Sequence, residues 1–509
     1  MEKINTDNKI ISFNEIEKKL AKLKKKNKLI VHCHGVFDLL HPGHLMHFKS
    51  AKKFGDILIV SVTSDKFVNK GFNRPYFDIN TRIKMISEMS IVDFVCESNF
   101  PSAVEVINKI KPNIYCKGPD YKNLKDDNSK NILNENRAIK FIKGKIKFTN
   151  DESFSSSKLI TNSLLENNEQ SKYLKKVQNL FENKNNKNFD KKLKKLKILV
   201  IGESIIDKYI FCEASGKSGK DPVLTMKYLR QESYLGGSLA ICRHLSSFCD
   251  KVTLVSYLGE KNEEFDFIKK NLEKNIKTIF FKKKNAPTII KTRYIESVNN
   301  IKTLGVYKIN DQSISKKEED TLIKKIKKNI DNHDLIIVSD YGHGLITGKI
   351  AKFISSSKKN YTLNAQKNSN NHGYTNLNKF SNINSLVINA SELRQEFKDS
   401  ETSLFKLAKK LKKKKYIRSL VVTQGKDGAL YMDDKKSFTC PAFAKNVVDK
   451  VGSGDAMLAV LALCNKIKLD PEISMYISSL AAANSIESIS NSAPITLQKI
   501  LKVLSHQIK

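Results

Sequence analysis

The sequence predicts two α/β domains in tandem, each built on a parallel sheet that is covered by helices. Three observations support this prediction. Short apolar runs of strand length recur along the chain and alternate with segments of helical periodicity. A stretch poor in large apolar residues separates an early series of these runs from a later one. A chain of 509 residues also exceeds the length that one hydrophobic core normally supports.

The first elements are a short lead-in over residues 1–27 and a domain over residues 28–164. Ile16, Leu20 and Leu23 stand at helical spacing and predict a helix in the lead-in. The domain opens with a βαβ unit, because two β-rich runs flank a segment of helical pattern. The predicted strands cover 28–31, 56–62, 94–95, 114–115 and 146–148, and the first helix covers 45–53.

A partly helical linker is predicted over residues 165–196. The segment is rich in asparagine, lysine and glutamate and has few large apolar residues, which is typical of a connection between domains. The second domain is expected over residues 197–509, a length that suits one large sheet. Its predicted strands cover 198–202, 252–255, 335–338, 386–388 and 420–423.

The chain is strongly basic, with 90 lysine and arginine residues against 53 acidic residues and a formal charge of +37. Such a charge is typical of nucleic-acid-binding proteins, which form the least favoured alternative. The lysines occur in every segment and are not interleaved with aromatic residues on one element, so we expect no nucleic-acid partner. A strongly positive field also favours anionic substrates such as nucleotides and sugar phosphates.

Membrane proteins and disulfide-rich secreted proteins are disfavoured as classes. No apolar run approaches the ~18 residues that a membrane helix requires, and the N-terminal segment is charged rather than signal-like. We therefore expect a cytoplasmic protein with no membrane partner. The eight cysteines form no Cys-x-x-Cys pair and are interpreted as small buried side chains in a reducing compartment.

A histidine motif follows the first predicted strand and opens the first helix. Residues 35–44 read Gly-Val-Phe-Asp-Leu-Leu-His-Pro-Gly-His. His41 and His44 are three residues apart at a helix N-terminus, so both can donate to one anion. Gly43 leaves room for a nucleotide to approach. Surface histidines or a metal site are the alternatives, but no third ligand is evident, and the glycine favours a phosphate.

This motif resembles the His-x-Gly-His hallmark of the cytidylyltransferase-like nucleotidyltransferases, which have a Rossmann-like fold. The resemblance covers about residues 29–163. It continues through the segments 51–56, 64–65, 70–71, 74–75, 82, 117–122 and 154–158. It implies in-line attack of a substrate phosphate oxygen on the α-phosphorus of a nucleoside triphosphate, with release of pyrophosphate.

The same resemblance implies roles for individual residues. His41 and His44 would stabilise the charge on the pentavalent phosphorus, with Lys70 as a further catalytic, phosphate-binding residue. The other implied nucleotide- or phosphate-binding residues are Gly35, Phe37, Arg82, Ser155, Ser156 and Ser157.

One departure bears on the nucleotide. Some cytidylyltransferases have an arginine shortly before the serine or threonine cluster, whereas this chain has Asn150, Asp151 and Glu152. The heptose-1-phosphate adenylyltransferase branch also lacks that arginine. The resemblance therefore favours ATP over CTP as the nucleotide donor, and CTP stays open.

A Gly-Ser-Gly-Asp turn stands near the C-terminus, directly before the apolar run 457–463. The N–H groups of a glycine-rich turn, with the positive end of a helix, form a cradle for a phosphate that gathers negative charge. Asp455 can take the proton from an attacking hydroxyl. The alternative is an ordinary turn with an aspartate at a helix N-cap. The cradle residues would be Gly452, Ser453 and Gly454.

Companion motifs in the second domain favour the phosphoryl-transfer interpretation. Asp207, after the first strand, can hold two hydroxyls, and Gly236 with Gly237 lets a polyol lie against backbone amides. Asn389 and Glu392 can orient a hydrated Mg²⁺ on ATP phosphates without a direct protein ligand. The positions past which the adenosine phosphates would run are Thr423, Gly425 and Gly428.

In this order the motifs resemble the ribokinase-like sugar kinases, and most nearly the heptose-7-phosphate kinase domain, over about residues 197–500. The resemblance implies a ribokinase-like α/β domain with a small β lid, with Asp455 as general base. The lid is expected around residues 222–228, and such lids often pair between subunits, so a homodimer is expected. Two lysines of the heptose kinases are replaced, by His343 and Gln366.

Both halves together resemble the bifunctional heptose-7-phosphate kinase/heptose-1-phosphate adenylyltransferases, with the domain order reversed. The expected function is phosphorylation of a sugar or sugar phosphate with ATP and Mg²⁺, and nucleotidyl transfer from ATP or CTP to a sugar or polyol phosphate. Such products serve surface polysaccharide synthesis. The alternative is an active transferase with a non-catalytic, sugar-binding kinase-like domain, which the two replaced lysines motivate.

Overall fold

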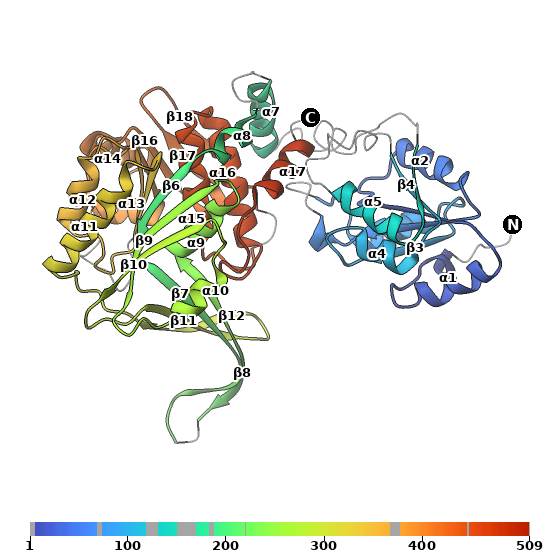
Figure 1. The fold of residues 1–509 in the computed structure, drawn as a ribbon, viewed down its shortest axis with the longest axis horizontal. Helices are drawn as coiled ribbons and strands as arrows, with labels where there is room; N and C mark the ends of the chain where they lie inside the picture. Colours follow the sequence, from blue (N-terminus) through green and yellow to red (C-terminus); the bar gives the residue numbers. More distant parts are fainter. Residues whose placement is uncertain are drawn as a thin grey trace. The chain divides into compact units, whose positions relative to one another are not determined.

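The computed structural model describes residues 6–68, 74–118, 131–149, 169–182, 188–218, 220–366, 377–444 and 447–507. The chain divides into two compact units (Figure 1). One comprises residues 1–172 with residues 498–509, and the other comprises residues 173–497. In the described part of the chain, no helix is long and apolar enough to cross a membrane.

The first unit contains a five-stranded parallel sheet in the order β3-β2-β1-β4-β5. All five strands were predicted, and the structure confirms them. The inner residues of β1, β2 and β4 are buried on both faces, which is why these strands appear as continuous apolar runs, whereas the edge strand β5 alternates lysine with apolar residues and is more exposed. The strands are β1 (Ile30–Gly35), β2 (Ile57–Thr63), β3 (Phe94–Ser98), β4 (Ile114–Lys117) and β5 (Lys145–Phe148).

Helices cover this sheet, and the predicted lead-in helix is one of them. Ile16 and Leu20 of α1 are buried in a cluster with Ile30 of β1 and Ile59 of β2. The described helices are η1 (Thr6–Lys9), α1 (Ile16–Lys25), α2 (Pro42–Lys52), η2 (Asp65–Phe67), α3 (Ile79–Ser87), α4 (Val104–Ile110), α5 (Asn131–Phe141) and α17 (Leu497–Gln507). The predicted linker contains α7 (Glu169–Phe181) and α8 (Phe189–Lys194).

The second unit is built on a nine-stranded sheet in the order β10-β9-β6-β13-β14-β15-β16-β17-β18. The first seven strands in this order are parallel, and the last two pair antiparallel at one edge. The strands are β6 (Lys197–Gly202), β9 (Lys251–Gly259), β10 (Ile276–Lys283), β13 (Leu335–Asp340), β14 (Tyr361–Ala365), β15 (Ser385–Asn389), β16 (Ser419–Thr423), β17 (Ala429–Met432) and β18 (Ser437–Cys440).

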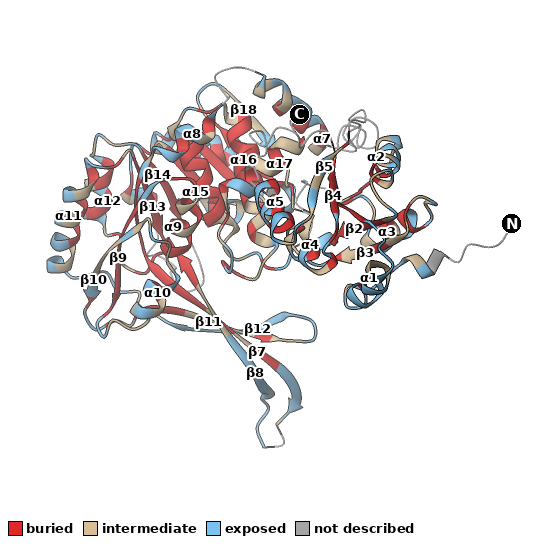
Figure 2. Cartoon of the chain, turned by 45° about the vertical axis from the view of Figure 1, so that its right-hand side comes forward, coloured by how far each residue is buried: buried red, intermediate tan, exposed pale blue. Residues whose placement is uncertain are grey.

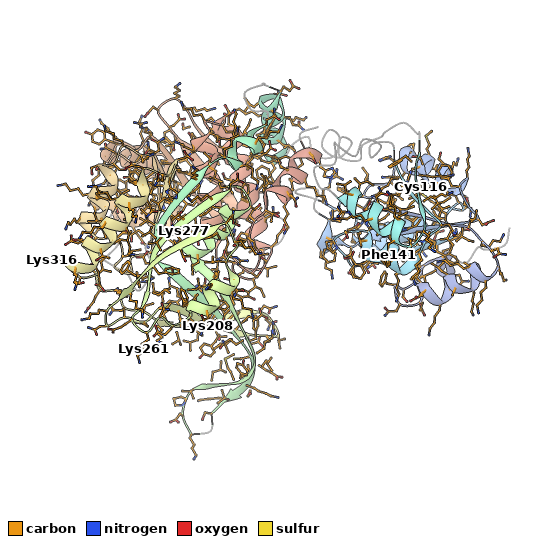
Figure 3. All side chains as sticks on the ribbon, in the orientation of Figure 1. Cys116, Phe141, Lys208, Lys261, Lys277 and Lys316 are labelled. Atoms are coloured by element: carbon orange, nitrogen blue, oxygen red, sulfur yellow. The ribbon has the colours of Figure 1, made fainter. Side chains whose placement is uncertain are left out.

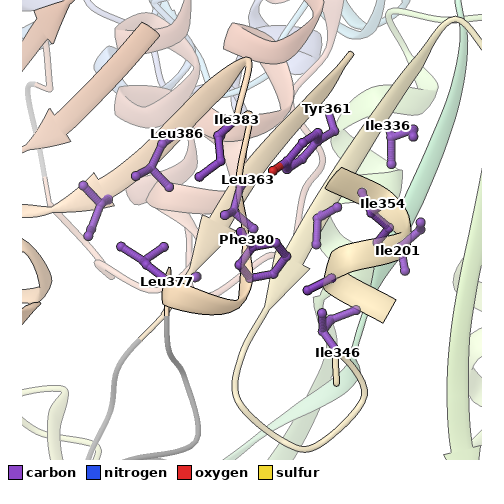
Figure 4. Close-up of a cluster of buried hydrophobic side chains, with 14 of the residues drawn as sticks. Ile201, Ile336, Ile346, Ile354, Tyr361, Leu363, Leu377, Phe380, Ile383 and Leu386 are labelled. Carbon is purple, nitrogen blue, oxygen red and sulfur yellow. The ribbon is translucent and has the colours of Figure 1, made fainter. Parts of the chain in front are cut away.

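Apolar side chains from this sheet pack against helices to form the main core. Figure 4 shows Ile336, Leu363 and Leu386 on neighbouring strands, with Ile354 from α12 and Phe380 against them. The helices are α9 (Ser238–Ser246), α10 (Phe265–Asn271), α11 (Lys316–Ile330), α12 (Gly348–Ser355), η6 (Leu377–Lys379), α13 (Ala390–Phe397), α14 (Leu404–Lys415), η7 (Gly425–Asp427), α15 (Ser453–Lys466) and α16 (Pro471–Ile486).

A separate four-stranded sheet, in the order β12-β11-β7-β8, forms the predicted lid. Its strands are β7 (Ser204–Lys217), β8 (Leu224–Gly237), β11 (Ile289–Glu296) and β12 (Ile301–Lys308). The β7–β8 hairpin extends away from the large sheet (Figure 1), and its outer end is exposed (Figure 2). The α/β architecture with a small β lid is therefore confirmed, and the lid is larger than the segment 222–228 that predicted it.

Candidate active sites

The carboxyl ends of the parallel strands in the second unit lie along one edge of the large sheet. The strand register pairs Ser339 of β13 with Gly202 of β6, and Asn389 of β15 with Thr423 of β16. Ligands of open α/β sheets bind outside this edge. Gly202 and Thr423, which are more than 200 residues apart in the chain, therefore lie along the same edge of the sheet and can face one ligand.

Asp455 lies in the first turn of α15 and is buried. The hydroxyl of Tyr341 donates a hydrogen bond of 2.8 Å to its Oδ1 atom. Burial raises the pKa of Asp455 to about 7, the Tyr341 hydrogen bond opposes the rise, and the charge of Asp207 adds to it. A carboxyl group that titrates near neutrality suits general-base catalysis.

The glycine turn before Asp455 has a conformation that requires glycine. Gly452 is the N-cap of α15, with a φ angle of 92°. A Cβ atom at this position would lie 2.2 Å from Oδ1 of Asn491. Ser453 and Gly454 then open the helix, so the backbone N–H groups of its first turn stand at the positive end of the helix dipole.

The lid contacts the segment that precedes this turn. Asp449 is buried, and its carboxylate accepts a hydrogen bond of 2.6 Å from the Tyr209 hydroxyl of β7. Lys302 of β12 forms an ion pair with the same carboxylate. These contacts connect two lid strands to the loop that leads into α15.

Asp207 and the glycine pair meet, as the sequence predicted. Asp207 is on β7, and Gly236 and Gly237 end the neighbouring strand β8. A Cβ atom at position 236 would lie 2.1 Å from Oδ2 of Asp207, so only glycine leaves this carboxylate in place. Oδ1 of Asp207 accepts a hydrogen bond of 2.5 Å from Arg293.

The sequence reasoning missed two cations beside Asp207. Lys291 of β11 is the register partner of Asp207, and Arg293 follows two residues later on the same face of the strand. The pKa of Lys291 is lowered, mainly by burial, and the negative charges of Asp207, Glu203 and Asp455 oppose this only in part. The signal was present as a Lys-Thr-Arg alternation inside an otherwise apolar strand, Ile-Ile-Lys-Thr-Arg-Tyr-Ile.

Glu203, at the end of β6, is another residue that the sequence reasoning missed. It is fully buried and accepts hydrogen bonds from the backbone N–H groups of Tyr341 (3.0 Å), His343 (3.2 Å) and Leu345 (3.4 Å). Burial, and then the charge of Asp340, raise the pKa of Glu203 to about 7. Glu203 thus fixes the loop that positions Tyr341 against Asp455.

The two residues that replace family lysines do not carry a positive charge. His343 is buried with Nδ1 at 2.6 Å from Oδ1 of Asp311, and burial lowers its pKa to about 4. Gln366 donates its backbone N–H to the carbonyl of Asp340. A different lysine, Lys379 of η6, instead lies 2.5 Å from Oδ2 of Asp340. Lys379 therefore supplies a positive charge at this edge of the sheet, from a different segment than the replaced lysines.

Lys283, at the end of β10, contacts the loop that follows β13. Its buried ammonium group donates to three backbone carbonyls, those of Asn310 (2.7 Å), Gln312 (2.6 Å) and His343 (3.1 Å). An ammonium group has three N–H donors, so all of them are satisfied. This arrangement joins β10, the segment after β12 and the loop after β13.

The residues that were predicted to bind the nucleotide lie at or just after the ends of strands β15 and β16. Asn389 and Glu392 form a reciprocal capping box at the start of α13, with hydrogen bonds of 2.8 and 2.9 Å. Their role toward Mg²⁺ stays a prediction. Thr423 ends β16, and Gly425 and Gly428 follow it with φ angles of 62° and 83°, within the turn that leads to β17.

In the first unit, the two motif histidines meet at the start of α2. His41 is the N-cap and Pro42 occupies the first turn. The rings of His41 and His44 stack with centroids 3.9 Å apart, and Phe37 packs edge-on against His44 at 5.5 Å. A Cβ atom at Gly35 would lie 2.9 Å from the Phe37 ring, so the glycine makes room for it.

Arg82 lies in α3 and is fully buried. Its guanidinium donates to the carbonyls of Phe77, Val36 and Thr63, and it forms an ion pair with Asp65. These bonds join the loops that follow β1 and β2. A phosphate contact would require Arg82 to exchange some of these partners, so that role stays a prediction.

Four predicted phosphate-binding residues lie outside the described residues. They are Lys70, Ser155, Ser156 and Ser157. Asn150, Asp151 and Glu152, which bear on the choice between ATP and CTP, also lie outside them.

Two family models match the chain in the predicted order. The model described as cytidylyltransferase-like matches residues 32–162, and that of the pfkB family of carbohydrate kinases matches residues 195–497. These matches confirm both resemblances and the reversed domain order.

The chain is also similar to curated bifunctional proteins. The bifunctional protein HldE of Aliarcobacter butzleri (strain RM4018) is 36% identical over 147 residues, which are 28% of this chain and 31% of the relative. HldE of Campylobacter jejuni (serotype O:2) is 29% identical over 280 residues, which are 54% of this chain and 58% of the relative. Each match thus spans less than two thirds of the relative.

Two solved structures of low sequence identity are among those that match the second unit. The ribokinase of Thermotoga maritima is 18% identical, with a TM-score of 0.48, over 61% of this chain and 99% of the ribokinase. Phosphofructokinase-2 of Escherichia coli in complex with fructose-6-phosphate is 13% identical, with a TM-score of 0.48, over 62% of this chain and all of that protein.

Proposed function

Because the chain belongs to the pfkB family of carbohydrate kinases, we propose that it is a bifunctional enzyme with a sugar kinase and a nucleotidyltransferase. The kinase phosphorylates a sugar or sugar phosphate with ATP. The transferase moves a nucleotidyl group from ATP or CTP onto a sugar or polyol phosphate and releases pyrophosphate, in the synthesis of an ADP-heptose-like nucleotide sugar for surface polysaccharide. The observation that carries the proposal is Asp455, buried at the start of α15 beside Tyr341 with a pKa of about 7.

In the kinase, the acceptor lies between Asp207 and Asp455. Asp207 binds its hydroxyls, and Asp455 takes the proton of the attacking hydroxyl as the new O–P bond forms. The first turn of α15 stabilises the charge on the transferred phosphoryl group. Mg²⁺ would reside on the ATP phosphates and neutralise their charge, and Asn389 and Glu392, at the start of α13, would orient its water shell.

In the transferase, the protein positions the two substrates and stabilises the charge that develops on the phosphate oxygens. His41 and His44 stand together at the N-terminus of α2, where the helix dipole favours an anion. A sugar phosphate oxygen attacks the α-phosphorus, the bond to the β-phosphate oxygen breaks, and the two histidines donate to the oxygens that gain charge. The kinase product is chemically suited to be this acceptor.

The acceptor of the kinase is itself a sugar phosphate in this proposal. Lys291 and Arg293 supply two positive charges beside the hydroxyl-binding Asp207, which a neutral sugar would not need. We expect Lys291→Met to raise the KM for a sugar phosphate about tenfold or more, since charged hydrogen bonds contribute ~1.5–3 kcal/mol, and to leave the KM for the unphosphorylated sugar nearly unchanged. Lys277→Met, at an exposed position of β10 (Figure 3), is the matched control. Equal KM changes for both acceptors would contradict the assignment.

The proposed function is tested by mass spectrometry of the products. The full chain is incubated with Mg²⁺, ATP, CTP and a panel of sugars and sugar phosphates. The expected products are a newly phosphorylated sugar and a compound with a diphosphate linkage, whose mass identifies the base. A diphosphate product without new sugar phosphorylation would instead support the non-catalytic kinase-like domain.

We also propose a homodimer that forms through the lid. Apolar side chains are exposed on β8 and β12, among them Leu224, Tyr228 and Val306. We expect the double variant Tyr228→Glu and Val306→Lys to halve the mass measured by light scattering. Phe405→Glu, exposed on α14 outside the lid, is the control and should leave the mass unchanged. A monomeric wild-type chain would exclude this dimer.

A further inference from the structure

Two cysteines and a histidine of the first unit lie together outside the sites described above. Cys33 of β1 and Cys116 of β4 are register partners on adjacent parallel strands, and both are buried (Cys116 is labelled in Figure 3). His47 of α2 lies against them. One ligand atom from each side chain lies within 4.8 Å of the other two. No other group of three His, Cys, Asp or Glu side chains among the described residues has this arrangement.

The His47 ring is held in place by a neighbour that is not part of this triad. Its Nδ1 atom lies 3.1 Å from the Thr149 hydroxyl, and Thr149 is buried directly after β5. Histidines that bind metals are characteristically oriented in this way, by a hydrogen bond to the second ring nitrogen. A metal ion bound at Nε2 of His47 would leave this contact between Nδ1 and Thr149 in place, so the triad combines three ligand atoms with a contact that can orient its histidine.

We propose that Cys33, His47 and Cys116 bind a zinc-class divalent metal ion. Both thiols release their protons to solvent on binding, so two thiolates, one neutral imidazole and one divalent ion have no net charge. Electroneutrality matters because an unpaired charge inside the sheet core would be strongly unfavourable.

The geometry of the triad also suits such an ion. Metal–sulfur distances of ~2.3 Å and metal–nitrogen distances of ~2.0 Å place tetrahedral ligand atoms about 3.5–3.8 Å apart, so the three side chains move inward by about 1 Å or less. Water fills the fourth position beside the half-buried His47.

The site would join three elements that carry the transferase. It links β1 and β4 to α2, whose first turn contains His41 and His44. His47 follows His44 by three residues and thus lies one turn further along the same helix. The bound ion would hold this helix on the sheet, a role separate from that of Mg²⁺ on nucleotide phosphates.

The test uses Co²⁺ as a spectroscopic probe on the full-length chain. We expect a thiolate-to-cobalt absorption band in the near ultraviolet that saturates at one cobalt per chain and disappears when Zn²⁺ is added. Cys116→Ser should lose the band. Two controls should keep it: Cys96→Ser, a buried cysteine of β3 in the same unit, and His44→Ala. Absence of the band in the wild-type chain, or an unchanged band in Cys116→Ser, would overturn the proposal.

A second pair of variants covers the case in which Cys116→Ser fails to fold. His47 is only half buried, so His47→Gln should keep the circular dichroism of the wild type while its cobalt affinity falls. Thr149→Val removes the orienting hydrogen bond and should weaken cobalt binding about tenfold or more. Wild-type cobalt affinity in His47→Gln would show that the histidine is not a ligand and would contradict the assigned triad.

Discussion

Asp455→Asn is expected to lower the kcat of the kinase by about 10²–10⁴-fold, the contribution that general bases typically make. Asparagine keeps the size and the Tyr341 contact of the aspartate but cannot accept the hydroxyl proton, so the KM for the acceptor should change little. The measurement is ADP release with a saturating acceptor. Asp266→Asn, at an exposed position of α10, is the control. Unchanged turnover would favour the non-catalytic kinase-like domain.

The same residue predicts a pH dependence. Asp455 must be unprotonated to act as a base, and its pKa is raised to about 7. The kcat/KM of the kinase should therefore rise with pH up to about 7 and then level off. The Tyr341 hydrogen bond opposes the rise in pKa, so Tyr341→Phe should move this limb of the profile to higher pH. A limb that stays in place would exclude Asp455 as the titrating group.

His44→Ala is expected to lower the rate of the transferase by ~10²-fold or more, as loss of a preorganised charge-stabilising donor does. The reason is local, because the His41 and His44 rings stack at the N-terminus of α2, where we expect both to donate to the same phosphate. Pyrophosphate release measures the effect, and ADP release by the kinase should not change.

Met46→Ala is the matched control for this variant, since Met46 is exposed on the same helix. It should keep the wild-type rate of pyrophosphate release. If His44→Ala also kept that rate, His44 would have no part in the mechanism.

The sequence was sufficient to predict most strands of both large sheets. Parallel strands are buried on both faces, so they appear as continuous apolar runs such as Ile198–Gly202. The lid was harder to predict, because its long hairpin is exposed and polar along much of its length. The lid was expected from the resemblance to the ribokinase-like sugar kinases, and only the short run 222–228 marked its place in the chain.

Residues were missed where their role depends on strand register. Lys291 acquires a role only because β11 places it beside Asp207, which is 84 residues away in the chain by their numbers. Glu203 acts through three backbone N–H groups of a distant loop, and no side-chain motif marks such contacts. Cys33 and Cys116 have no metal-binding spacing in sequence, and only the pairing of β1 with β4 places them together.

Several of the motifs that were found share a simple property. They are turns that stand directly before a helix, as with Gly452 before α15 and His41 before α2. Glycine, histidine and aspartate at such turns are recognisable in a single sequence because the local backbone requires them. Contacts made in the middle of a strand leave a weaker pattern, such as the Lys-Thr-Arg alternation of β11.

Lys283 gives the kinase a cation that cannot diffuse away. A free cation held by the carbonyls of Asn310, Gln312 and His343 would exchange with solvent, and its occupancy would follow the salt content of the cell. Here the cation is attached to β10 through its own side chain. We therefore expect the loop that carries Tyr341 to Asp455 to keep its shape at low and at high salt concentration.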